Sequence, residues 1–226
     1  RAYFFYRSEL LIRSETIETF FGRAGHINFT RCGLPIDVQK RIGEKFWGSP
    51  DTVDAIGDYT PTNIYKMKRL QWVVARKELH DMLGICSWTA PWEVSPLREK
   101  GYIGDIEMES KVFRAVTGIE MTQDDLDKAG LRAFILQRLY TMRQLKSRNP
   151  RQDHDQYPEW IFWDPKGKAP FTKGTIRMER SDIEKSFDLF YGLMDFDVKT
   201  GAPTEKSLKE YGLDFALPTM KQEGLM

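Results

Sequence analysis

Asp81 and Cys86, five positions apart, are the two residues of this chain whose types and spacing are most suited to chemistry. A cysteine thiolate can ligate an iron–sulfur cluster, and a carboxylate can accept two N–H donors side by side. Gly84 lies between them and would let the backbone approach a ligand closely. Each residue also has an ordinary role, because most single cysteines are buried and inert and a charged residue late in a helix usually faces water.

A long amphipathic segment is predicted to position this pair. Thr62 is a suitable N-cap for a helix that begins there, and Gly84 suits its end because glycine tolerates the left-handed conformation found just past many helix C-termini. We therefore expect Asp81 on the last turn and Cys86 just beyond it. The apolar stripe of this helix is Ile64, Met67, Leu70 and Val74, and the expected solvated face includes Lys66, Lys68 and Arg69.

Helical patterns dominate the rest of the chain and predict a mainly α fold. Thr122 with Asp125 forms a near capping box, and Ser181 with Glu184 forms a full one. The expected helices, besides the one from Thr62, are Ile36 to Phe46, about Asp105 to Val116, the segment from Thr122 through Tyr140, Ser181 to about Leu193, and a short helix after Thr204 that ends at Gly212.

Length, charge and cysteine content restrict the class of protein. The 34 basic and 33 acidic side chains among 226 residues nearly cancel, which disfavours a nucleic-acid or anionic-membrane partner. The apolar runs fall far short of the roughly 20 residues that a spanning helix needs. Two cysteines, Cys32 and Cys86, cannot form a disulfide framework, so a cytoplasmic location is expected.

The chain begins at Arg1 without an initiator methionine and reads as part of a longer protein. We divide it into residues 1–61, a connecting or partial-domain segment, and residues 62–226, a C-terminal helical domain that carries the Asp81–Cys86 motif. Neither cysteine lies in a C-x-x-C pair, so a cluster bound at Cys86 would need three further ligands from elsewhere.

The Asp81–Cys86 motif resembles a signature of the tungsten-dependent aldehyde ferredoxin oxidoreductases. Their motif is D-x-x-G-L-C, and here Ile85 replaces the leucine. A second segment, Arg151–Pro158, resembles the Arg- and Asp-rich segment of this family that ends in Leu-Pro, with Tyr157 in place of the leucine.

A third segment, Phe190–Thr204, resembles the family's near-terminal Tyr-Tyr-x-x-x-Gly-Trp-Asp-x-x-Gly-x-Pro-Thr. Met194–Phe196 replaces the usual Arg-Gly-Trp, and Leu208–Leu213 matches the closing Leu-x-x-x-Gly-Leu. The three motifs follow one another in the family's order. Together they cover roughly residues 62–215, so the chain resembles the C-terminal helical part of a tungstopterin oxidoreductase.

The resemblance implies a set of cofactors and the residues that bind them. The cofactors are a tungsten or molybdenum bis-pterin and a 4Fe-4S cluster. Asp81, Gly84, Ile85 and Cys86 are the implied cofactor-binding residues: Asp81 would orient a pterin, and Cys86 would be one metal ligand, to the cluster. The catalytic residues and the other cluster ligands would lie upstream of this chain, in the missing N-terminal part.

The implied reaction is oxidation of an aldehyde to a carboxylic acid, with electrons passed to ferredoxin or to an iron–sulfur electron-transfer subunit. The implied partners are the rest of the same enzyme and a small aldehyde or acyl substrate, without nucleic acid or membrane, and an oligomer is compatible with the sequence. The chain alone is expected to be inactive.

Two alternatives remain at the level of sequence. The tungsten subunit of the benzoyl-coenzyme A reductases belongs to the same superfamily and carries a cysteine at the equivalent place. A non-enzymatic helical interaction module is the other, because the aromatic segments Trp88–Trp92 and Trp160–Trp163 could mark an interface. His26, His80 and His154 are expected to be surface or packing residues rather than catalytic ones.

Overall fold

The computed structural model describes residues 35–52, 62–85, 93–156 and 180–226. Within these ranges the fold is helical and has no strands, only the isolated β-bridges Val94↔Ile103 and Phe196↔Pro203. The prediction of a mainly α fold is therefore confirmed. The elements are α2 (Ile36–Trp47), η2 (Pro50–Thr52), α3 (Ile64–Leu83), η3 (Arg98–Lys100), α4 (Met108–Thr117), α5 (Gln123–Leu145), α6 (Pro150–Asp153), α7 (Arg180–Leu193), α8 (Glu205–Glu210), η5 (Asp214–Ala216) and α9 (Leu217–Gln222).

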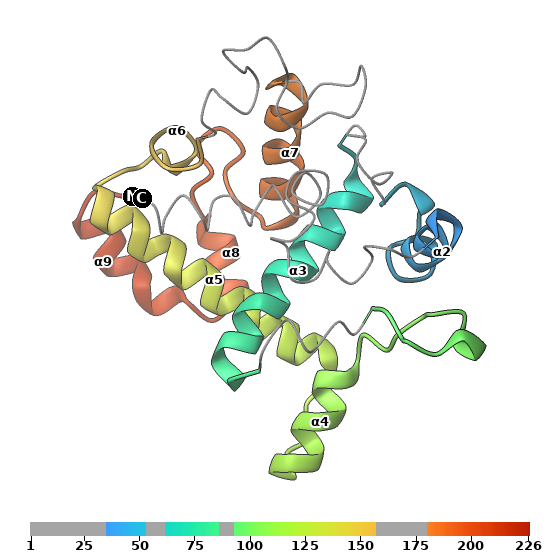
Figure 1. Cartoon of the computed structure of the whole chain (residues 1–226). Coiled ribbons are helices and arrows are strands. Elements are labelled where there is room, and N and C mark those ends of the chain that lie inside the picture. The colour runs from blue at the N-terminus through green and yellow to red at the C-terminus, as the bar shows by residue number, and fades with distance from the viewer. Residues whose placement is uncertain (1–34, 53–61, 86–92, 157–179) are drawn as a thin grey trace.

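The two longest helices, α3 and α5, cross at the centre of the molecule (Figure 1). Ala75 of α3 and Gly130 of α5 lie at a close approach of the two backbones. A Cβ atom added at Gly130 would lie 2.2 Å from the carbonyl oxygen of Ala75, well inside van der Waals contact. The two helices can therefore pack this closely only because residue 130 is a glycine.

The main hydrophobic core lies where α7 and the C-terminal helices pack around α3 and α5. Each of these helices contributes at least one fully buried apolar side chain. Burial of such side chains contributes roughly 1.5–3 kcal/mol each. Five examples, one from each of α3, α5, α7, α8 and α9, are Leu70, Ile135, Phe190, Leu208 and Met220.

Helix α2 packs on the outer side of α3 through aromatic rings. The ring centroids of Trp47 and Trp72 are 5.1 Å apart, with the planes tilted. The Arg76 guanidinium lies 5.2 Å from the Trp72 centroid on the following turn of α3. This stack links the first described helix to the centre of the fold. The predicted division of the chain at residue 61 stays a prediction.

Several helix ends agree with the local sequence signals. Thr122 and Asp125 form a reciprocal capping box at the start of α5, with the Thr122 hydroxyl accepting from the Asp125 amide at 3.1 Å. Thr204 caps α8 by accepting from the Ser207 amide at 3.1 Å. Gly48 ends α2 in the left-handed conformation, with φ of 83°. These caps involve residues within one turn of each other, so local sequence is enough to predict them.

Two predicted N-caps are wrong, and for the first of them a long-range contact is the reason. Asn63, not Thr62, caps α3 by accepting from the Lys66 amide at 2.9 Å. Thr62 instead donates its backbone N–H to the Asp182 carboxylate, and its hydroxyl lies 2.6 Å from that of Ser186. Ser181 lies inside α7, which already includes Arg180, and its neighbour Asp182 serves as the acceptor for Thr62.

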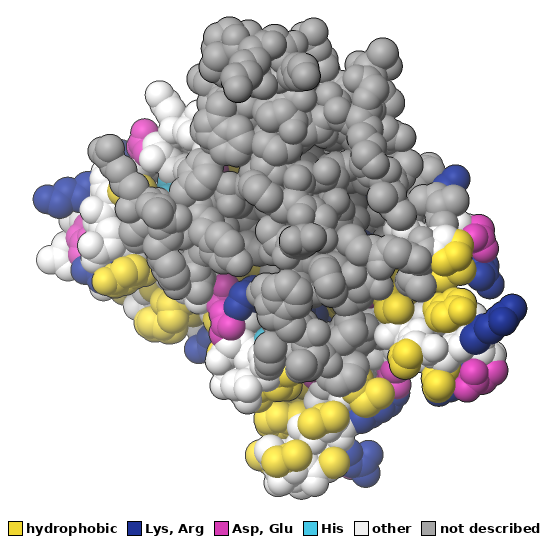
Figure 2. All heavy atoms as spheres, viewed as in Figure 1, with side chains coloured by type: hydrophobic (Ala, Val, Ile, Leu, Met, Phe, Trp, Pro, Cys, Tyr) yellow, Lys and Arg dark blue, Asp and Glu magenta, His cyan; other side chains and the backbone are white. Residues whose placement is uncertain are grey.

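Helix α4 projects from the rest of the described structure at the bottom of Figure 1. Hydrophobic side chains are visible on its surface in Figure 2. Val112 and Val116, one turn apart, are 41% and 79% exposed, and Ile119 just beyond the helix is 55% exposed. Glu109, in the first turn of α4, is by contrast buried. The first turn of α4 is therefore attached to the body, by Glu109 to α3 and by the Ser110 amide to Gln123 of α5, while the later turns project.

Substituting Gly130 by alanine is expected to lower the free energy of unfolding by about 1–3 kcal/mol. Overpacking against a fixed backbone typically costs this much, and it outweighs the better helix propensity of alanine. Gly192→Ala in α7 is the matched control, because no heavy atom of the described residues lies within 4 Å of a Cβ at Gly192. Urea denaturation measures both variants. Equal stability of the two would show that the α3–α5 approach is not limiting.

Candidate cofactor site

The C-terminal end of α3 places the predicted cofactor residues. Gly84 has φ of 69°, and its N–H donates to the carbonyl oxygen of His80. The N–H of Ile85 donates to the same oxygen, with an N···O distance of 2.9 Å. The first is the last ordinary bond of the helix, and the second requires the chain to reverse at a left-handed residue, for which glycine has no steric cost. The prediction that Gly84 ends this helix is confirmed.

Asp81 lies on the last turn of α3 with its side chain 49% exposed. Its carboxylate accepts from the Lys77 ammonium at 2.5 Å, one turn earlier. This ion pair offsets part of the unfavourable interaction between an anion and the C-terminal end of the helix dipole. The carboxylate has further acceptor lone pairs besides the one that Lys77 uses. Asp81 is therefore available to a ligand from the solvent side.

The structure brings three of the four predicted residues together. Asp81 and Gly84 are exposed and Ile85 is half-buried, all within one turn and the residues that follow it. Cys86 lies outside the described residues, as do the aromatic segments Trp88–Trp92 and Trp160–Trp163. Whether the four residues bind a cofactor stays a prediction.

The described part of this site offers a carboxylate acceptor three residues from a glycine that has no near neighbours among the described residues. Among the described residues, no heavy atom lies within 4 Å of a Cβ built at Gly84, so the backbone is open to close approach. The Asp81 carboxylate supplies the acceptors. No group of three or more His, Cys, Asp or Glu side chains in the described ranges could hold a metal ion. A cluster bound at Cys86 would thus take its other ligands from outside these ranges.

A cluster of charged side chains and a histidine lies in the preceding turn of α3 and the helices packed on it. The sequence analysis did not predict this cluster. The Arg76 guanidinium bonds the Glu109 carboxylate, and both side chains are at most 1% exposed. His80 Nε2 lies 2.9 Å from the other oxygen of Glu109. Arg76 also pairs with Asp127 of α5, at 2.9 Å from its Nε. The expectation that His80 is a packing residue agrees with its exposure of 1%.

The second and third sequence motifs meet at another buried carboxylate, that of Asp155. Arg138 and Tyr191 both donate to Asp155 Oδ2 at 2.5 Å, and His154 Nδ1 lies 2.7 Å from Oδ1. Arg138 also donates through Nε to the carbonyl oxygen of Gly201 at 2.7 Å. Residues from α5, α6 and its C-terminal turn, α7 and the loop before α8 are therefore tied together at one point.

The protonation states of Asp155 and Tyr191 follow from their surroundings in this network. Burial by itself would raise the pKa of Asp155, but the Arg138 guanidinium and the hydrogen bonds outweigh it and hold the pKa well below its usual range. Burial raises the pKa of Tyr191 far above its usual range, and the Asp155 charge raises it further. At neutral pH Asp155 is therefore ionised, and Tyr191 keeps the proton that it donates.

The cationic face predicted for α3 is the largest error of the sequence analysis. Lys68 is exposed, but Lys66 is 2% exposed and Arg69 is fully buried. Arg69 Nη2 donates to Glu93 Oε1 at 2.8 Å, and neither side chain is exposed. Because α3 runs through the centre of the fold, its charged face is covered, and a distant carboxylate neutralises the arginine.

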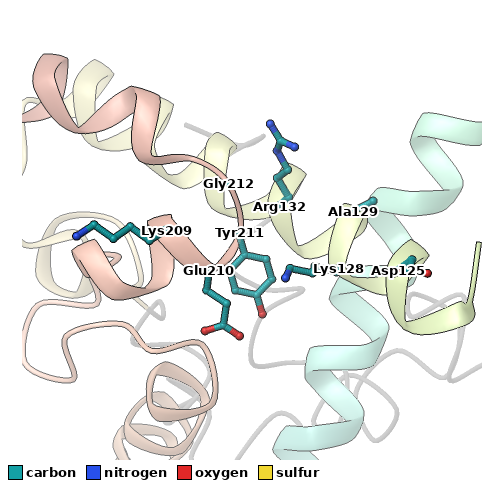
Figure 3. Close-up of a pocket in the computed structure, with 8 residues that line it drawn as sticks. All are labelled: Asp125, Lys128, Ala129, Arg132, Lys209, Glu210, Tyr211 and Gly212. Atoms are coloured by element: carbon teal, nitrogen blue, oxygen red, sulfur yellow. The ribbon is translucent and has the colours of Figure 1, made fainter.

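A surface pocket of about 380 Å³ lies between α5 and the end of α8 (Figure 3). In this view the Lys128 side chain points toward the Tyr211 ring, while Arg132 and Lys209 point outward. Asp125 and Glu210 also line it, so the charges are mixed and do not select a ligand of one sign. Burial raises the pKa of Tyr211, which keeps its hydroxyl protonated at neutral pH. None of the predicted cofactor residues line this pocket.

Comparison with known families bears on all three motifs. Residues 27–213 match the family model described as aldehyde ferredoxin oxidoreductase, domains 2 and 3. The chain belongs to the aldehyde ferredoxin oxidoreductase family. The match spans the Asp81–Cys86 motif, Asp155 and the closing Gly212-Leu213, which confirms that this is a C-terminal portion of such an enzyme.

Membership in the aldehyde ferredoxin oxidoreductase family makes the chain part of an oxidoreductase at family level. Enzymes of this family use a tungsten or molybdenum pterin. The family thus favours an oxidoreductase over the helical interaction module. Domains 2 and 3 belong to a larger enzyme, so the rest of that enzyme is a partner of these residues. Within the described ranges, no helix has the length and apolar character needed to cross a bilayer.

Proposed function

We propose that this chain supplies part of the cofactor site of a tungsten-pterin, iron–sulfur oxidoreductase. The enzyme would oxidise an aldehyde and water to a carboxylic acid, releasing two protons and passing two electrons to ferredoxin. The observation that carries the proposal is the end of α3, where the exposed Asp81 carboxylate lies on the turn before the left-handed Gly84. Membership in the aldehyde ferredoxin oxidoreductase family supports the same function.

Each residue of the motif has a distinct role in this proposal. Asp81 accepts two N–H groups of a pterin side by side, which fixes the orientation of the ring. Gly84 lets that ring approach the backbone, since no side chain intervenes. Cys86 provides one thiolate ligand to a 4Fe-4S cluster. When bound, the tungsten and the cluster supply the electron transfers that no protein side chain can perform.

The first test is the metal content of the native assembly that contains this chain. We expect tungsten and about four irons per assembly unit, the content of one 4Fe-4S cluster. Replacing Cys86 by alanine is expected to remove most of the iron, because a cubane cluster loses one of its four thiolate ligands. Elemental analysis for tungsten, molybdenum and iron measures both proteins.

Cys32→Ala is the matched control, since it also removes one cysteine but lies outside every motif. Its iron content is expected to equal that of the wild type. Equal loss of iron in both variants would contradict a specific role for Cys86. Absence of tungsten, molybdenum and iron from the wild-type assembly would contradict the whole proposal and favour a packing or interaction role.

A further inference from the structure

Three helices contribute to the buried charged group that lies one turn before the motif. Arg76 and His80 come from α3, Glu109 from α4 and Asp127 from α5. The Arg76 guanidinium contacts Glu109, Asp127 and the carbonyl oxygen of Ile106, the last at 2.7 Å from Nη2. Taking such charges out of water costs several kcal/mol each, and pairing roughly compensates that cost. These charged residues therefore add little net stability to the fold. Their fixed geometry, which holds neighbouring groups in position, is a better explanation for their presence.

The Glu109 carboxylate contacts the ring of His80. An ionised carboxylate supplies only acceptors, so with Glu109 in that form the imidazole N–H at Nε2 is the donor to Glu109 Oε1, 2.9 Å away. The second oxygen of Glu109 is held by Arg76. Both residues of the pair are at most 1% exposed, so water does not compete for these bonds. Glu109 of α4 thus holds the Nε2 edge of the imidazole.

The backbone of His80 holds the motif itself. Its carbonyl oxygen accepts the N–H groups of Gly84 and Ile85, which are the bonds that close the left-handed turn. Asp81 is the next residue on the helix. One residue therefore links the side chain of Glu109 to the turn on which Asp81 and Gly84 lie.

We propose that His80 and Glu109 are positioning residues for the cofactor motif, with Glu109 fixing His80 and His80 fixing the turn that presents Asp81 and Gly84. This inference rests on the proposed function of the motif. Partners that orient metal-binding residues from behind typically change metal affinity or activity by 10–100-fold when removed. Both side chains are buried, so their expected effect passes through the turn that the His80 carbonyl oxygen closes.

The test compares two substitutions of His80 in the native assembly. Leucine fills a similar volume but cannot donate, whereas glutamine keeps an N–H that can reach Glu109. We expect His80→Leu to shift the electron paramagnetic resonance spectrum and the reduction potential of the cluster, and to weaken retention of tungsten about 10–100-fold. His80→Gln is expected to restore wild-type spectra and retention.

Gln137→Leu is the matched control for general loss of packing. Gln137 of α5 donates to Glu78 of α3 at 2.5 Å, so its loss also breaks an α3–α5 contact. This variant is expected to lose stability without a spectral shift. If it shifts the spectrum as much as His80→Leu does, the effect is general loosening and the positioning role is wrong.

The other outcomes separate this inference from the proposed function. A wild-type assembly with full metal content, whose spectrum and tungsten retention do not change in His80→Leu, would overturn the positioning role alone. A wild-type assembly without metal would overturn both. Should His80→Leu fail to fold, Glu109→Asp gives the same test, because it keeps the charge for Arg76 but withdraws the carboxylate from His80. The same spectral shift is then expected, and its absence in the folded variant would contradict the proposal.

Discussion

Replacing Arg138 by methionine is expected to lower the free energy of unfolding by about 3–5 kcal/mol, the usual result of removing one partner of a buried ion pair. Asp155 would remain ionised and buried without its cation, since its exposure is 1%. The hydrogen bond from Arg138 Nε to the Gly201 carbonyl oxygen would also be lost. Denaturation by urea, monitored by circular dichroism of the full chain, measures the change.

Arg143→Met is the control for this prediction. Arg143 also lies on α5 and pairs with a carboxylate, that of Glu223, but its side chain is 46% exposed. Exposed pairs contribute about 0–1 kcal/mol, so a small change is expected. Adding Asp155→Asn to Arg138→Met should recover part of the loss by removing the unpaired charge. Similar losses for the two arginine variants would mean that burial does not determine the contribution of Arg138.

Replacing Gly201 by alanine is expected to cost about 2–5 kcal/mol, from two independent causes. Gly201 has φ of 68°, where an L-residue is strained by roughly 1–2 kcal/mol. A Cβ there would also lie 2.7 Å from Arg138 Nη2 and 2.8 Å from Tyr191 Cζ, which adds about 1–3 kcal/mol of overpacking. The free energy of unfolding from urea denaturation measures the sum.

Gly118→Ala separates the two causes. Gly118 has φ of 73°, and no heavy atom of the described residues lies within 4 Å of its added Cβ. Only the conformational cost of about 1–2 kcal/mol is expected at this position. A loss in Gly201→Ala no larger than that in Gly118→Ala would show that Arg138 and Tyr191 move aside without cost.

Local signals predicted the parts of the fold that depend on neighbours in sequence. The capping box of Thr122 and the left-handed Gly84 involve residues within one turn, so propensity and spacing suffice. The start of α3 was misplaced by one residue because Thr62 contacts Asp182, 120 residues away. No local pattern carries that information.

The buried charges were beyond sequence reasoning for the same reason. Arg69 and Glu93 are 24 residues apart and His80 and Glu109 are 29 apart, so neither pair has helical spacing. A lysine or arginine on an amphipathic helix is usually solvated, and only the three-dimensional path of α3 through the core makes Arg69 an exception.

The candidate site was predicted through its motif rather than through its geometry. As predicted, Asp81 lies on the last turn of α3 and Gly84 ends that helix; the carboxylate is exposed and the glycine is left-handed. The contribution of His80 was missed because it acts through its main chain as much as through its ring. Main-chain acceptors have no residue-type signature, so spacing alone could not have indicated this role.

The sequence separations within the Asp155 network determine when it can form during synthesis. Arg138 finds its acceptors 17 and 63 residues further along the chain, at Asp155 and Gly201. The Asp155 carboxylate that neutralises Arg138 is synthesised early, whereas the Gly201 carbonyl oxygen that accepts from Nε is made only near the end of the chain. Contacts of such long range slow folding, because the intervening chain must be ordered first. The surroundings of Arg138 are therefore completed only when the loop before α8 has been made, although its neutralising carboxylate is present much earlier.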